Sequence, residues 1–173
     1  MGATTLASVE DYLQASHRPD REYIDGTVLE RNGGEKDHSR LQMLLADYLY
    51  SREGEWGITV FPEQRVQVSS SRFRVPDICV VAGAEPEEQI FTRPPFLCIE
   101  LLSREDTMRD MQERIDDHLR FGVPNVWLID PRTRRAWTCT VEGNLEAKDA
   151  RLRTQHPPID VDLARIFHSM PKR

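Results

Sequence analysis

The sequence predicts an α/β domain in which helices flank a mixed central sheet, and two observations lead to this prediction. Residues 74–81 and 95–102 are apolar on both faces, which is typical of central strands that are covered on both sides. Residues 107–121 then show helical periodicity and precede a third apolar segment, residues 125–130. A helix between two apolar strands indicates a right-handed β-α-β crossover, so we expect the strands at 95–102 and 125–130 to lie parallel.

The length and composition are typical of one water-facing domain. The 173 residues can bury a substantial core, and we expect a single domain over residues 1–173 with its core at about residues 5–167. Charged residues make up 30% of the chain, and no stretch approaches the roughly 20 apolar residues that cross a bilayer, which excludes a membrane protein. Because residues 1–9 do not resemble a secretory signal, we expect a cytoplasmic location.

The three cysteines and the net charge further limit the possible classes of function. Cys79, Cys98 and Cys139 all fall in predicted strands, and their odd count without a close pair argues against disulfides or a zinc site. We therefore expect them to be small buried side chains. The net charge of −6 argues mildly against a protein coated for long nucleic-acid contacts.

The N-terminal part of the chain predicts a helix and a hairpin. Residues 5–15 carry apolar residues at helical spacing, with Thr5 or Ser8 available as the cap. Residues 22–30 predict two short strands around Asp25-Gly26, a dipeptide that tolerates the positive φ of a tight turn. We expect this hairpin to lead the central sheet.

A second helix and a meander follow. Residues 37–52 form an amphipathic pattern that Gly54 should end. Residues 58–61 and 65–68 are strand candidates, and we expect them to form an antiparallel meander with the strand at 74–81.

The C-terminal part adds a loop, edge strands and a helix. Residues 83–95 are polar and predict a loop, while the helix at 107–121 ends at a glycine followed by a proline. Residues 136–141 and the region around Leu145 can add edge strands. Residues 160–167 predict a closing helix because their apolar residues recur at helical spacing.

Asp77 and Glu100 stand inside the two apolar strands, where a carboxylate is costly. An ionised group that leaves water without a partner costs on the order of several kcal/mol, so each must pair with a cation, bind a metal or change protonation. Because side chains alternate across a strand, Asp77 points with Cys79 and Glu100 with Cys98. If both face one cavity, their oxygens suit Mg²⁺ or Mn²⁺, and phosphodiester hydrolysis is the expected use.

The order of several short motifs resembles one protein family. The motifs are Tyr23-Ile24-Asp25-Gly26, His38 at a helix start, Val75-Pro76-Asp77, Ile99-Glu100-Leu101-Leu102-Ser103, and Gly122-Val123-Pro124 followed by Trp127-Leu128-Ile129-Asp130-Pro131. In this order and spacing, the chain resembles the Uma-type family of bacterial proteins, within the PD-(D/E)xK restriction-endonuclease-like superfamily. The resemblance runs from about residue 5 to about residue 167.

This resemblance implies a restriction-endonuclease-like fold and a metal-dependent nuclease acting on DNA. Asp77 and Glu100 match the two acidic positions, which implies that they bind Mg²⁺ or Mn²⁺ and take part in catalysis. Leu102 stands where the superfamily usually has lysine. In this family the lysine lies on the following helix, at the position of Arg114 here, which makes Arg114 the third expected catalytic residue. Dimers are common among such nucleases, which leaves a homodimer as an expected assembly.

The arginine at position 114 leaves open whether the chain is an active nuclease. An arginine stays protonated, so Arg114 can position a phosphate but cannot act as a base. It can also close onto Glu100 or Asp77 in a bidentate ion pair and displace the metal, which would give an impaired nuclease. Lys36 is the lysine that could substitute. The alternatives are a scaffold of the same fold that binds nucleic acid or itself, and a hydrolase of small phosphorylated molecules.

Several other residues have a functional and a structural interpretation. Glu30 and Glu63 could supply an oxygen ligand, although surface charge is the favoured interpretation. His38 could contact the site or cap its helix, and His118 is interpreted as packing. Two basic groups could touch a nucleic-acid backbone, although solvated loops are favoured for both: Arg72 with Arg74, and Arg132 with Arg134 and Arg135.

Overall fold

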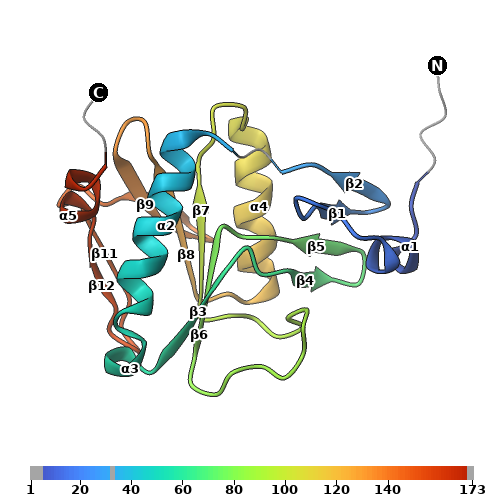
Figure 1. Ribbon diagram of the computed structural model, residues 1–173, viewed down its shortest axis with the longest axis horizontal. Helices are drawn as coiled ribbons and strands as arrows, with labels where there is room; N and C mark the ends of the chain where they lie inside the picture. Colours follow the sequence, from blue (N-terminus) through green and yellow to red (C-terminus); the bar gives the residue numbers. More distant parts are fainter. Residues whose placement is uncertain (1–5, 32–33, 171–173) are drawn as a thin grey trace.

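The computed structural model describes residues 6–31 and 34–170, and a six-stranded mixed sheet lies at its centre (Figure 1). The strand order is β10-β9-β8-β7-β6-β3. Its strands are β3 (Ile58–Pro62), β6 (Ile78–Ala82), β7 (Leu97–Leu101), β8 (Asn125–Asp130), β9 (Arg135–Thr140) and β10 (Gly143–Glu146). β7 and β8 pair in parallel and the other neighbours pair antiparallel, which confirms the predicted mixed sheet and its crossover.

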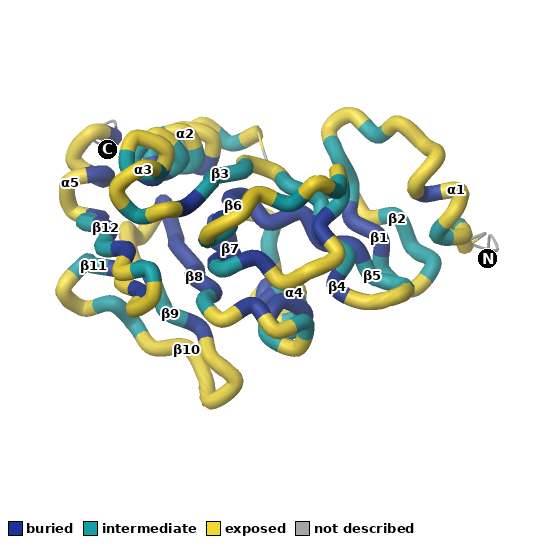
Figure 2. Tube along the Cα trace, turned by 90° about the horizontal axis from the view of Figure 1, so that it is seen from below, coloured by how far each residue is buried: buried dark blue, intermediate teal, exposed yellow. Residues whose placement is uncertain are grey.

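Two long helices cover opposite faces of this sheet, α2 (Lys36–Tyr50) and α4 (Met108–Phe121). The apolar cluster under α2 contains Ile78 and Ile99, whereas the cluster under α4 contains Cys98 and Val126. Successive residues of one strand therefore face different helices, as the pleat requires. The middle strands are buried and β10 at the edge is exposed (Figure 2). The segments at 95–102 and 125–130 contain central strands as predicted. The strand predicted at 74–81 is divided, because Arg74 ends a strand of a second sheet and β6 begins only at Ile78, just after Asp77.

A second, four-stranded sheet lies beside α4 and corrects the predicted meander. Its order is β2-β1-β5-β4, with β1 (Glu22–Ile24), β2 (Thr27–Leu29), β4 (Val66–Ser69) and β5 (Arg72–Arg74). The hairpin therefore does not lead the central sheet, and β4 pairs with β5 rather than with β3 or β6. The reason is an aromatic cluster of Tyr12, Tyr23 and Phe73, which gives the small sheet its own core.

The predicted boundaries of the first two helices change. α1 (Val9–Gln14) begins with a capping box at Ser8, and the alternative cap Thr5 lies outside the described residues. The prediction that Gly54 ends the second helix is wrong, because α2 ends earlier and Gly54 lies within α3 (Glu53–Trp56). Gly57 ends α3 in the left-handed conformation.

The predicted closing helix at 160–167 is wrong in its first residues. Asp160–Asp162 is strand β12, which pairs antiparallel with β11 (Arg151–Arg153), and α5 (Leu163–His168) begins only after it. The side chain of Asp162 accepts a hydrogen bond from the N–H of Arg165, which caps α5. Pairing with β11 outweighs the helical pattern of a segment that is too short to form a helix alone.

All three cysteines are buried free thiols, as expected. Burial raises the pKa of the Cys139 thiol to about 12. Among the helices of the described residues, none has both the length and the apolar character that a membrane span requires.

Gly122 ends α4, and its replacement by alanine is expected to destabilise the fold by about 1–2 kcal/mol, because its φ of 103° lies in the left-handed region. Gly54→Ala is the matched control, because Gly54 lies in a helix with open space around it and the same change there should be neutral or stabilising. Chemical denaturation measures both. Equal effects at the two glycines would contradict this explanation.

Candidate active site

β6 and β7 bring Asp77 and Glu100 together. Their antiparallel register pairs Ile78 with Ile99, and one further step places Asp77 opposite Glu100. The Oδ2 atom of Asp77 accepts a hydrogen bond of 2.7 Å from the N–H of Leu101. Both acids are buried, with exposed fractions of 4% and 2%. The two residues are therefore neighbours at the same edge of the central sheet.

The Asp77 carboxylate is held by the side chains of Arg31 and His38, which come from other elements. The guanidinium of Arg31, after β2, lies 2.8 Å from Oδ1, and Nε2 of His38, in α2, lies 3.4 Å from the same atom. Burial alone would lower the pKa of His38, but the hydrogen bond to Asp77 and the charge of that carboxylate outweigh it and raise the pKa above its usual value. His38 therefore contacts the site, one of the two roles that the sequence allowed.

The main chain of Asp77 is fixed as well. Its carbonyl oxygen accepts hydrogen bonds from Nε2 of Gln42 at 3.0 Å and from the N–H of Glu63 at 3.2 Å. The side chain of Glu63 is half-exposed and lies 3.4 Å from Arg31. Glu63 is thus both a surface charge and a neighbour of the site.

Glu100 is paired with His118 from α4. Nε2 of His118 lies 2.8 Å from Oε1 of Glu100, and both side chains are almost fully buried. Nδ1 of His118 is buried without a hydrogen-bond partner within the described residues. The interpretation of His118 as packing missed this contact. The signal was present in the sequence, because His118 follows Arg114 by four residues on the helix that covers the Glu100 face.

Arg114 lies beside the carboxylates without pairing to them. Its recorded ion pairs join it to Asp106, at 3.2 Å, and to Glu22, at 3.7 Å. Burial alone would lower its pKa, but the charges of Glu100, Glu22, Asp106 and Asp77 outweigh that effect and raise the pKa. Arg114 therefore stays protonated and contributes positive charge to the site, as the sequence indicated.

Arg72 and Arg74 belong to a buried ion network rather than to a solvated loop or a nucleic-acid contact. Arg74 is 3% exposed and lies 2.7 Å from both Glu22 and Asp117. Arg72 also contacts Asp117, at 3.1 Å, and pairs with Asp25 at 2.6 Å. This network ties the small sheet to α4, and through the shared Glu22 it reaches Arg114.

Two cavities are lined by charged residues that the sequence analysis considered, and neither is lined by Asp77 or Glu100. One of about 230 Å³ is lined by Arg114, Glu30 and Asp110, among others. The second, of about 440 Å³, lies at the N-terminal end of α2, near the carboxyl ends of β7 and β8, and its lining residues are Glu35, Lys36, Asp37, Arg104 and Arg132. Figure 1 shows this helix end beside the loop that enters α4. Lys36 thus lines a cavity at this edge, while Glu30 pairs with Arg21 at 2.5 Å.

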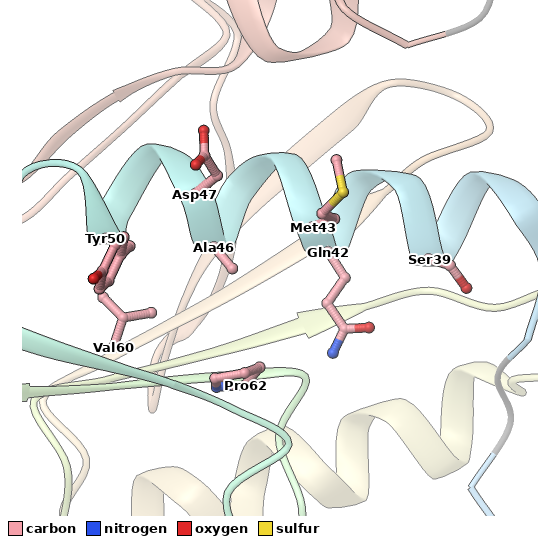
Figure 3. Close-up of a pocket in the computed structure, with 8 residues that line it drawn as sticks. All are labelled: Ser39, Gln42, Met43, Ala46, Asp47, Tyr50, Val60 and Pro62. Atoms are coloured by element: carbon pink, nitrogen blue, oxygen red, sulfur yellow. The ribbon is translucent and has the colours of Figure 1, made fainter.

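An apolar groove of about 460 Å³ lies between α2 and β3 (Figure 3). Figure 3 shows Gln42 pointing from α2 toward Pro62, so the residue that holds the Asp77 carbonyl also lines this groove. The exposed edge of β3 is protected against pairing with a further strand. Glu53 accepts a hydrogen bond from the N–H of Val60 at 2.7 Å, and Pro62 has no N–H to donate. Among the described residues that line the groove, Asp47 alone is charged, so it does not suit hydrolytic chemistry.

The donor set fits a hard divalent cation. Asp77 and Glu100 offer carboxylate oxygens from facing positions, and Mg²⁺ commonly takes one or two carboxylates together with water and substrate phosphates. Within the part of the chain that the structure describes, no group of three or more His, Cys, Asp or Glu side chains is arranged to hold a metal. A cation here would therefore depend on this pair, and it would compete with Arg31 for Asp77.

Comparisons with known proteins agree with this fold. The sequence model of the Uma2 family, described as "Putative restriction endonuclease", matches residues 9–164. A crystal structure of a "putative nuclease belonging to DUF820" from Anabaena variabilis ATCC 29413 has a TM-score of 0.79 and 21% identity, and the match covers 92% of this chain and 96% of that chain.

A more distant likeness is to a DrdV-DNA complex solved by cryo-electron microscopy, with a TM-score of 0.45 and 15% identity over 78% of this chain and 11% of that chain. No curated protein matches the sequence. The similarity to the DUF820 protein shows the restriction-endonuclease-like fold that the sequence predicted.

Proposed function

The chain belongs to the Uma2 family, and from that membership we propose that it is a metal-dependent nuclease that hydrolyses phosphodiester bonds of DNA. The observation that carries the proposal is the pair of buried carboxylates, with Asp77 immediately before β6 and Glu100 in the neighbouring strand β7.

The side chains around the pair have distinct roles in this proposal. Asp77 and Glu100 would hold Mg²⁺ or Mn²⁺, which supplies Lewis-acid stabilisation and a water of lowered pKa when bound. His118 orients the Glu100 carboxylate through its hydrogen bond of 2.8 Å. Arg114 stays protonated and positions a phosphate by charge, because it cannot act as a general base.

The second cavity supports DNA as the substrate. Lys36, Arg104 and Arg132 line it together with Glu35 and Asp37, at the edge of the sheet where Asp77 and Glu100 lie, and such basic side chains contact backbone phosphates. Because the whole chain carries a net charge of −6, this local cluster rather than a general basic surface would attract the substrate.

A catalytically impaired scaffold of the same fold is the second candidate. The observation that favours it is the ion pair of 2.8 Å between Arg31 and Asp77, which neutralises one of the two acids within the protein itself. The two candidates differ in the expected effect of residue 114.

Arg114→Lys is expected to raise the rate of plasmid nicking in Mg²⁺ by about 10-fold, because lysine is a compact charge that approaches a phosphate more closely than a guanidinium held by two acids. Arg135→Lys is the matched control, since Arg135 is half-exposed and pairs with Glu146 on the β9–β10 hairpin. A chain that nicks DNA in neither form, in Mg²⁺ or in Mn²⁺, contradicts the nuclease proposal and leaves the scaffold.

A further inference from the structure

Arg31 separates Asp77 from solvent. The exposed fraction of the side chains rises from 6% at Asp77 to 12% at Arg31 and 50% at Glu63, and the guanidinium of Arg31 contacts both acids. A ligand that reaches Oδ1 of Asp77 from this side must displace the guanidinium, and it shares that atom with Nε2 of His38, which lies 3.4 Å away. The other carboxylate oxygen of Asp77, Oδ2, accepts a hydrogen bond from the N–H of Leu101 in β7.

We propose that Arg31 is an exchangeable counter-ion. It pairs with Asp77 while the site is free of metal, moves to Glu63 when a divalent cation takes Oδ1, and there contacts a phosphate of the substrate. This inference rests on the proposed function, and it adds Arg31 to Arg114 as a second cationic group for the phosphate, because Arg114 also pairs with Asp106 and Glu22.

Each charged group has a partner of opposite charge before and after the exchange. Two carboxylates at Asp77 and Glu100 attract a divalent cation more strongly than a single guanidinium, since the Coulomb energy scales with the charge of the ion. Arg31 does not lose its partner, because Glu63 lies 3.4 Å away. The main chain of Glu63 is anchored beside Asp77, because its N–H donates to the carbonyl of Asp77 at 3.2 Å.

The phosphate contact follows from the same geometry. A guanidinium presents a planar fork of N–H donors that matches phosphate oxygens, and one paired to a half-exposed acid keeps donors free for solvent or substrate. After the exchange, Arg31 lies on the solvent side of the metal ligands. We expect the substrate on that side, because Oδ2 of Asp77 already accepts the N–H of Leu101 and Gln42 of α2 holds the carbonyl of Asp77.

Calorimetric titration with Mn²⁺ tests the exchange. In Arg31→Ala, the affinity for Mn²⁺ should rise by about 10-fold because the competing cation is gone. The rate of plasmid nicking at saturating Mn²⁺ should nevertheless fall, because the phosphate contact is lost. Arg135→Ala removes an equal charge from a distant exposed ion pair and should change neither quantity.

A double-mutant cycle separates Arg31 from simple electrostatics. Glu63→Gln removes the alternative partner, so Arg31 should hold Asp77 more firmly and Mn²⁺ affinity should fall by about 3-fold. In the Arg31→Ala background, Glu63→Gln should have almost no effect. The same loss in both backgrounds would mean that Glu63 acts directly on the metal and would overturn the exchange.

The remaining outcomes distinguish this inference from the proposed function. A wild type that binds Mn²⁺ and nicks DNA, with unchanged affinity in Arg31→Ala, overturns the exchange and leaves the nuclease intact. Faster nicking in Arg31→Ala overturns the phosphate contact. Absence of Mn²⁺ binding and of nicking in both proteins overturns the function and the inference together.

Discussion

Asp77→Asn is expected to abolish Mn²⁺ binding and to lower the rate of plasmid nicking by about 100-fold or more, because one of the two charged ligands is lost. The change is nearly isosteric. The amide oxygen of asparagine can still accept the N–H of Leu101, which Oδ2 of Asp77 accepts at 2.7 Å. The strand pairing of β6 and β7 should therefore persist, so that the loss reports on the site rather than on folding.

Asp130→Asn is the control for this experiment. Asp130 is a buried aspartate at the end of β8, on the same edge of the sheet, where it accepts the N–H of Arg132 at 2.8 Å and the hydroxyl of Thr133 at 2.8 Å. Its neutralisation should leave metal binding unchanged. Calorimetry, nicking and thermal unfolding of both variants complete the measurement. If Asp77→Asn binds Mn²⁺ as tightly as the wild type, the carboxylate pair is not the metal site.

The two acids could be predicted from the sequence because their signal is local. A carboxylate within an apolar strand is conspicuous, and the alternation of side chains gives its face. The face alone does not bring Asp77 to Glu100. That step depends on the antiparallel pairing of β6 with β7, which is a long-range contact.

The partners of the acids were harder to foresee. Arg31 reaches Asp77 across 46 positions of the chain, and nothing in its own neighbourhood indicates that contact. His118 could have been found, because it occupies the next turn of α4 after Arg114. The small sheet was missed for a related reason. β4 pairs with β5 through a local turn, while the aromatic cluster that gives this sheet its core draws Tyr12 and Phe73 together from distant segments.

Arg74→Ala is expected to destabilise the protein by about 3–5 kcal/mol, because it leaves buried carboxylates without their counter-ion. Glu22 and Asp117 are 3% and 4% exposed, and each lies 2.7 Å from the guanidinium. Water cannot take over the role of Arg74 at such depth. The residual partners are more distant or more exposed: Arg72 contacts Asp117 at 3.1 Å, the exposed Arg120 lies 3.8 Å from Asp117, and Nε of Arg114 lies 3.7 Å from Glu22.

Arg72→Ala is the matched control, because it removes the same charge from the same network at a more exposed position. The Arg72 side chain is 24% exposed, against 4% for Arg74, and its partner Asp25 is half-exposed. Screening by solvent should limit its loss to about 1 kcal/mol. Urea denaturation followed by circular dichroism gives both free energies. Equal losses would show that burial of the acids does not determine the cost.

Arg74→Ala is expected to affect the candidate active site as well as stability. Without Arg74, Glu22 retains Arg114 as its recorded cationic partner, so Arg114 should be drawn further toward Glu22 and away from the charge of Glu100. Arg74→Ala should then weaken nicking under conditions where the protein is still folded, whereas Arg72→Ala should not. Glu22→Gln in the Arg74→Ala background removes the uncompensated charge and should recover part of both the stability and the rate, because the buried acid, not the missing guanidinium, is the source of the cost.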